Sequence, residues 1–299
     1  ILLLSVSAMK EKLWLSLYDE LLDFLNKIGF KGSFKFKDKS VQKTFEELRE
    51  KFRDEFVNYI VNGELVKAQY WIRQFKRSLE EVMDKLRIEG VFLSKELNSF
   101  IRDPKEHLKK KIFNYTYDLL RGKMDVIDFE RRAGAAVRTS FRTNLRSIYQ
   151  DWAFLTILSL LSEEGRFKVV FPEHMYLHLE RFGKQKSRTI PPNIILEDPL
   201  GRCLSFFLEA PRPLGWEDSL DLKEIWNFYT ALRPDLLVYT TKVLDIVDIG
   251  RDPPIKRPDA ILEFKELEDW YVRSRDVKGP LAKPLTAEEW RSRWIEGLW

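Results

Sequence analysis

The sequence is short of cysteine, of phosphate-binding glycine loops and of long apolar runs, and each shortage excludes a class of protein. Cys203 is the only cysteine among the 299 residues, so a disulfide framework and a cysteine-based zinc cluster are excluded. No glycine-rich loop of the kind that cradles nucleotide phosphates is present. No apolar run approaches the roughly 18 to 20 residues that span a bilayer. We therefore expect a cytoplasmic protein that does not enter a membrane.

Charge is distributed unevenly along the chain. Residues 1–150 carry 30 Lys+Arg against 22 Asp+Glu, whereas residues 151–299 carry 21 against 25. A basic half joined to a slightly acidic half suits a protein that holds a polyanion and collects carboxylates at a site. Ordinary surface charge would explain the same numbers. The charged fraction of 33% also fits the ion-pair-rich composition of proteins from thermophiles.

The first part of the chain has the hydrophobic periodicity of helices. Apolar residues recur at i, i+3 and i+4 in several stretches. Glycines mark the ends of these stretches, and an Asp-Pro pair marks the start of one. The alternation of lysine and phenylalanine in 34–39 instead suggests a small strand or hairpin. We predict a helical domain over 1–135, with helices over 10–28, 45–60, 71–86 and 104–121. A further helix over 125–164 crosses the domain boundary and could belong to either part.

After residue 165 the pattern changes to short apolar runs between turn signals. Such runs are typical of strands, and a helical segment at about 217–231 interrupts them. An amphipathic helix over 286–298 is predicted to close the chain. We predict an α/β domain over 136–299, with strands at 167–171, 193–196, 203–208, 236–240 and 260–264.

Two of these predicted strands carry charged residues where a buried strand would begin or end. Glu263-Phe264-Lys265 ends one apolar run, and strand alternation places Glu263 and Lys265 side by side on one face. Asp235, preceded by Pro234, opens the other run 28 residues earlier. If the two strands pair, the two carboxylates approach each other. Close carboxylates repel unless a divalent cation lies between them.

The combination of Pro234-Asp235 with Glu263-Phe264-Lys265 on neighbouring strands resembles the PD-(D/E)XK nuclease superfamily, which has the restriction-endonuclease-like fold. The resemblance covers about 140–299 and implies a mixed sheet flanked by helices. It implies that Asp235, Glu263 and the backbone carbonyl of Phe264 bind Mg²⁺ or Mn²⁺. It also implies that Lys265 is the catalytic lysine, and that a homodimer is one form in which such an enzyme acts.

Several alternatives stay open at the level of sequence. Asp259, in a second Pro-Asp pair, is the alternative or auxiliary metal ligand, although it lies only four residues before Glu263. A plain ion pair at a strand end would account for Glu263 and Lys265 without any catalysis. A further acid of the site would come from Glu209 or from the helix before the first strand, which carries Asp151, Glu163 and Glu164.

Arginines recur every four residues on the helix that precedes the α/β part. Arg138, Arg142 and Arg146 form a row that would follow a phosphate backbone, or else a solvated face paired with acids. Together with the carboxylate pair, the row leads to the hypothesis of a magnesium-dependent nuclease that hydrolyses DNA phosphodiester bonds. The alternative is a non-catalytic nucleic-acid-binding or assembly protein that retains the nuclease fold.

Overall fold

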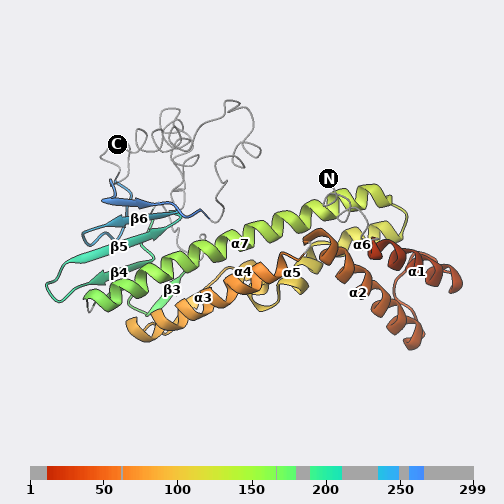
Figure 1. Cartoon of the computed structure of the whole chain (residues 1–299), viewed down its shortest axis with the longest axis horizontal. Helices are drawn as coiled ribbons and strands as arrows, with labels where there is room; N and C mark the ends of the chain where they lie inside the picture. The colour runs from red at the N-terminus through yellow and green to blue at the C-terminus, as the bar shows by residue number, and fades with distance from the viewer. Residues whose placement is uncertain are drawn as a thin grey trace, which may run out of the picture. The chain divides into compact units, whose positions relative to one another are not determined.

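The computed structural model describes residues 12–61, 63–165, 167–179, 189–210, 235–248 and 256–265. Within these residues the chain is a mixed α+β protein with seven helices and two sheets (Figure 1). The helices are α1 (Leu13–Lys27), α2 (Lys39–Val61), α3 (Leu65–Leu86), α4 (Lys95–Arg102), α5 (Pro104–Lys111), α6 (Phe113–Leu120) and α7 (Val126–Gly165). The strands are β1 (Gly90–Phe92), β2 (Lys168–Phe171), β3 (Tyr176–His178), β4 (Ile194–Glu197), β5 (Cys203–Leu208), β6 (Leu236–Tyr239) and β7 (Ala260–Leu262).

None of the helices in the described part of the chain is both long and apolar enough to cross a membrane.

The chain divides into two compact units. The first, here called the helical unit, comprises Ile1–Ile72 and Lys95–Ser147, and the second, the sheet unit, comprises Arg73–Ser94 and Ile148–Trp299. Helices α3 and α7 contribute residues to both units. The boundary predicted near residue 135 lies within α7, and it stays a prediction.

Aromatic side chains form the core of the helical unit. Trp14 of α1 is buried and lies edge-on to Phe56 of α2, with 5.1 Å between the ring centroids. Phe52 and Phe129 complete the cluster from α2 and α7. These residues stand at the helical spacing that the sequence shows, so the apolar stripes of three helices meet here.

Two predictions for the helical unit are wrong. Residues 34–36 are not a strand, because the buried Phe34 ring stacks on Phe45 at 5.2 Å and holds the segment against α2. The backbone N–H of Phe36 donates to the side-chain oxygen of Gln42, 3.0 Å away, instead of to a partner strand. The helix predicted over 104–121 is broken into α5 and α6 at Ile112.

The break at Ile112 follows from a contact with another helix. Arg53 of α2 donates from Nη2 to the carbonyl oxygen of Lys109 at 2.7 Å. The N–H of Ile112 donates to the same oxygen at 3.3 Å, as in a tight last turn. An uninterrupted helix would give this carbonyl to residue 113 instead. The periodicity of apolar residues in 104–121 could not predict this break, because the donor, Arg53, lies 56 residues away in the sequence.

The sheet unit is built on a sheet of five strands among the described residues, in the order β2-β4-β5-β6-β7, with every neighbouring pair antiparallel. All five strands lie where the sequence predicts them, within one or two residues. A second, parallel pair of β1 and β3 was not predicted. Each of these two strands has only three residues, too few to show a periodicity.

Apolar side chains cover both faces of the five-stranded sheet. On one face Phe207, Leu237 and Ile261 lie opposite one another on β5, β6 and β7 and join a buried cluster. On the other face the ring of Phe206 contacts Phe154 of α7, with 6.0 Å between centroids. Figure 1 shows α3 running beside α7, where Lys85 donates to the hydroxyl oxygen of Ser159 at 2.9 Å.

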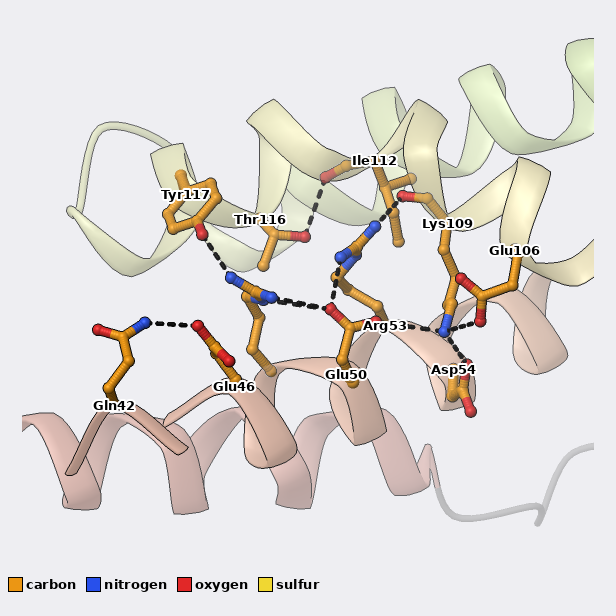
Figure 2. Close-up of polar contacts among 11 residues, drawn as sticks. Gln42, Glu46, Glu50, Arg53, Asp54, Glu106, Lys109, Ile112, Thr116 and Tyr117 are labelled. Atoms are coloured by element: carbon orange, nitrogen blue, oxygen red, sulfur yellow. Dashed lines mark hydrogen bonds and ion pairs between the residues drawn. The ribbon is translucent and has the colours of Figure 1, made fainter. Parts of the chain in front are cut away.

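Charged side chains join α5 to α2 in a network around two buried cations, Arg53 and Lys109 (Figure 2). Lys109 is 5% exposed, and its ammonium contacts the carboxylates of Asp54 at 2.9 Å, of Glu50 at 3.2 Å and of Glu106. Arg53 donates to the other oxygen of Glu50 at 2.8 Å. Each buried cation therefore faces acids, which offsets the cost of taking the charges out of water.

Opposing effects set the pKa values in this network. Burial raises the pKa of Glu50 and of Asp54, but Arg53 and Lys109 beside the first and Lys109 and Lys105 beside the second lower both pKa values overall. Burial lowers the pKa of Lys109, but its three carboxylate partners raise it overall. The acids thus contribute stability above their unfolded pKa values, near 4, and Lys109 contributes it below its own, near 10.4.

We expect Lys109→Met to lower the free energy of unfolding by about 1–2 kcal/mol near pH 7, because it removes the shared cation from acids that are 37–52% exposed and so partly solvated. The loss should shrink as the pH falls below about 4, where Glu50 and Asp54 become protonated in the native protein as well. Urea unfolding between pH 3 and pH 8 measures both effects. Lys43→Met, which removes an exposed partner of Glu47 on α2, is the matched control and should change stability by less than about 0.5 kcal/mol.

Candidate active site

The antiparallel pairing of β6 with β7 brings the two predicted carboxylates together. Leu236 pairs with Leu262, so Asp235, just before β6, lies opposite Glu263, just after β7. The N–H of Asp235 donates to Oε2 of Glu263 at 3.2 Å. The two strands predicted separately from their apolar runs thus place both acids at one end of the pair.

Backbone and side-chain donors fix the orientation of both acids. The N–H of Phe264 donates to Oδ2 of Asp235 at 2.7 Å. Together with the bond from the N–H of Asp235 to Glu263, it links the two strand ends in both directions. Lys265 forms an ion pair with Oε1 of Glu263. Strand β7 ends at Leu262, so these contacts, and not strand alternation, hold Glu263 and Lys265 at the same place. Asp235, Glu263 and Lys265 therefore form one connected cluster, the acidic pair with its lysine.

A fourth member of the cluster, Gln150 of α7, was missed by sequence reasoning. Its Nε2 donates to Oδ1 of Asp235 at 2.6 Å, and Gln150 and Asp235 are 5% and 6% exposed. Gln150 precedes Phe154 and Leu158 by four and eight residues, and these two are buried. That apolar stripe was the available signal, because it places Gln150 on a buried face of the helix.

The two carboxyl groups affect each other electrostatically. Burial and the neighbouring Asp235 raise the pKa of the Glu263 carboxyl, although Lys265 pulls it in the opposite direction. The side chains of Glu263 and Lys265 are each 30% exposed, so solvent reaches them. A positive charge placed between the two acids would relieve the remaining repulsion.

The other acids named from the sequence lie in different places. Asp259 is at the opposite end of the β6–β7 pair, where its Oδ2 accepts from the N–H of Thr240 at 2.7 Å and from the Thr240 hydroxyl at 2.9 Å. Glu209, at a φ of 40°, follows β5 and donates its N–H to the carbonyl oxygen of Asp235 at 2.8 Å. Glu163 pairs with Lys85. Asp151, which is 4% exposed and follows Gln150 on α7, and Glu209 are the candidates for a further acid, and Asp259 lies apart from the acidic pair.

The donor set of the acidic pair suits a hard divalent cation. In the described residues no three His, Cys, Asp or Glu side chains form a metal-binding group. Mg²⁺ does not require one, because it keeps several waters and binds proteins through one or two carboxylates. Asp235 and Glu263 supply two carboxylates, and the carbonyl oxygen of Phe264, between Glu263 and Lys265, is the further oxygen that the resemblance implies. Pro234 and Arg233 lie outside the described residues, as do the helices predicted at 217–231 and 286–298.

The predicted arginine row lies in the helical unit. Arg138, Arg142 and Arg146 are exposed along α7, and the intervening Phe141 and Leu145 are buried. The helix therefore presents a basic outer face along three successive turns, as the four-residue spacing predicts.

Comparison with known proteins found no matching family model, no matching curated protein and no matching solved structure.

We expect Mn²⁺ or Mg²⁺ to raise the thermal unfolding midpoint of the wild-type protein. A ligand at about 100 times its Kd stabilises the native state by about 2.7 kcal/mol, which corresponds to a shift of several degrees. Asp235→Asn should abolish the shift, because it removes the charge of one carboxylate from the acidic pair. Differential scanning calorimetry with and without EDTA measures this metal-dependent change in the unfolding midpoint.

The matched control is Asp259→Asn, which makes the same change at the other end of the same two strands. It should leave the metal-dependent shift intact. The reverse result, with the shift lost in Asp259→Asn and kept in Asp235→Asn, would move the metal to the far end of the strand pair.

Proposed function

We propose that the protein is a magnesium- or manganese-dependent nuclease that hydrolyses phosphodiester bonds of DNA. The observation that carries the proposal is the acidic pair with its lysine: Asp235, Glu263 and Lys265 meet at one end of two antiparallel strands. The resemblance to the PD-(D/E)XK superfamily assigns the same three residues to one site. The resemblance implies a mixed sheet, whereas every neighbouring pair in the described five-stranded sheet is antiparallel, so the acidic pair with its lysine, and not the strand directions, supports the proposal.

The roles of the residues follow from their chemistry. Asp235 and Glu263 hold the cation, with the carbonyl oxygen of Phe264 as a further ligand. A divalent cation bound there lowers the pKa of a coordinated water and stabilises charge on a phosphoryl oxygen. Lys265 contributes a positive charge next to Glu263, where it orients the attacking water or neutralises the negative charge that develops on the phosphate.

The exposed arginine row supplies the grip on the nucleic acid in this proposal. Phosphate contacts from Arg and Lys carry most of the affinity for nucleic acid and hold it without regard to sequence. Arg138, Arg142 and Arg146 project such charges from one face of α7. We also propose that the protein is cytoplasmic and that it acts as a homodimer.

Lys265→Ala should lower the rate of DNA cleavage by about 10²–10³-fold, the usual effect of removing one group that stabilises the transition state. DNA affinity should stay within about twofold, because phosphate contacts are spread over many basic residues. Cleavage of plasmid and of single-stranded DNA under Mg²⁺, with affinity measured by fluorescence anisotropy, separates the two effects.

Lys242→Ala is the control for this experiment, since Lys242 is an exposed lysine near the far end of β6 in the same unit. It should cleave at the wild-type rate. Wild-type cleavage by Lys265→Ala would reduce Glu263 and Lys265 to an ion pair at a strand end. A wild-type protein that binds DNA but cleaves no substrate would instead favour the non-catalytic binding or assembly protein.

Charge reversal of Arg138, Arg142 and Arg146 to glutamate should weaken DNA binding and reduce the slope of log K against log salt by about three. The metal-dependent rise in unfolding midpoint should persist. The control reverses three other exposed basic residues of the helical unit, Lys35, Lys37 and Lys39, and changes the net charge equally. An equal loss of affinity in both triple variants would show a general charge effect and no specific role for the row.

A further inference from the structure

We propose that Gln150 is a positioning residue that holds the Asp235 carboxylate in the orientation required to bind the divalent cation. The inference rests on the proposed function and extends it to a residue that belongs to neither the acidic pair nor its lysine. Gln150 comes from α7, 85 residues before Asp235 in the chain, and reaches the site only through the packing of that helix in the sheet unit.

The geometry of the Asp235 carboxylate supports this role. Nε2 of Gln150 donates to Oδ1 at 2.6 Å, and the N–H of Phe264 donates to Oδ2 at 2.7 Å. One donor on each oxygen fixes the rotation of the carboxylate about its Cβ–Cγ bond. Each oxygen has a second acceptor position, because a carboxylate offers about four lone-pair sites in all. The two hydrogen bonds therefore orient the group, and a carboxylate that accepts such bonds can also bind a cation.

The chemistry of an amide suits this task better than that of the alternatives. An ionised carboxylate only accepts hydrogen bonds, so its partner must be a donor, and a glutamate in place of Gln150 would repel it. A lysine or arginine would donate, but it would add a second full positive charge to a pair of acids that Lys265 already contacts, and would compete with the cation. A neutral amide orients the carboxylate without neutralising it.

Burial makes the contact consequential. Gln150 and Asp235 are both almost fully removed from solvent. Water cannot readily replace the amide, so loss of the donor frees the carboxylate to turn. Residues that hold metal ligands in this way typically change metal affinity or activity by about 10–100-fold when they are removed.

The test replaces Gln150 with methionine, which has a similar length and flexibility but no hydrogen-bond donor. In the metal-free protein the amide hydrogen of Phe264 should exchange roughly tenfold faster, because its acceptor is no longer held in place. Isothermal titration with Mn²⁺ should show an affinity about tenfold weaker or more. Cleavage at saturating Mn²⁺ should stay within a few fold of wild type, so that the defect appears in the metal requirement and little in kcat.

Two further variants of the full-length chain complete the design. Gln150→Asn keeps the amide but is one methylene shorter, so it should shift both readings in the same direction with less disturbance of packing. Asn144→Leu is the matched control: Asn144 is a buried amide of the same helix, 3% exposed, that donates to the carbonyl oxygen of Ser140 at 2.8 Å. It should leave Phe264 exchange and Mn²⁺ affinity unchanged.

The outcomes separate this inference from the proposed function. Wild-type Phe264 exchange and Mn²⁺ affinity in both Gln150 variants would overturn the positioning role and leave the nuclease proposal standing. Equal changes in Asn144→Leu would also overturn it, because they would show a general loss of helix stability. A wild-type protein that binds no Mn²⁺ would overturn the metal-dependent nuclease itself, and with it the inference, whatever the exchange of Phe264.

Discussion

The register between β6 and β7 is the constraint on which the candidate site depends. Because Leu236 lies opposite Leu262, the residue that enters β6 and the residue that leaves β7 are neighbours. A slip by one residue would turn the side chains of a strand to the opposite face of the sheet. Phe207, Leu237 and Ile261 prevent such a slip, since they pack on one face as a row across three strands. The apolar core of the sheet thus sets the distance between the two acids.

Packing of α7 adds the second requirement, a donor for Asp235. Phe154 contacts Phe206 on the sheet, and Gln150 lies one helical turn earlier on the same side of the helix. The contact between Phe154 and Phe206 therefore positions α7 so that the amide of Gln150 reaches the carboxylate of Asp235. Hydrogen bonds between α3 and α7 in this unit, such as the one from Lys85 to Ser159, help to hold the helix in place. The hydrogen bond from Gln150 to Asp235 therefore depends on the packing of α7 against the sheet and against α3.

The periodicity of apolar residues was sufficient to predict features that depend on short stretches of sequence. The five strands of the larger sheet are predictable from their apolar runs, and Asp235, Glu263 and Lys265 are predictable as a group because each stands at the end of such a run. Other contacts between distant segments were not predictable. Arg53 ends α5 through a carbonyl of Lys109, and the hairpin expected at 34–39 gives way to stacking on Phe45. Gln150 belongs to the same class, since only the tertiary packing of α7 gives it a partner.

Carboxylates of this chain occur in two different electrostatic settings, and the difference bears on function. Glu50 and Asp54 of the helical unit are surrounded by cations, and their pKa values are lowered. Glu263 has Lys265 on one side but burial and Asp235 on the other, and its pKa is raised. A carboxylate whose charge is already compensated has little to gain from a further cation. Glu263 is compensated less fully, because burial and Asp235 outweigh the opposing effect of Lys265 on its pKa. Perturbed groups of this kind cluster at functional sites, and the perturbed carboxyl here is one of the two that we propose as ligands of a divalent cation.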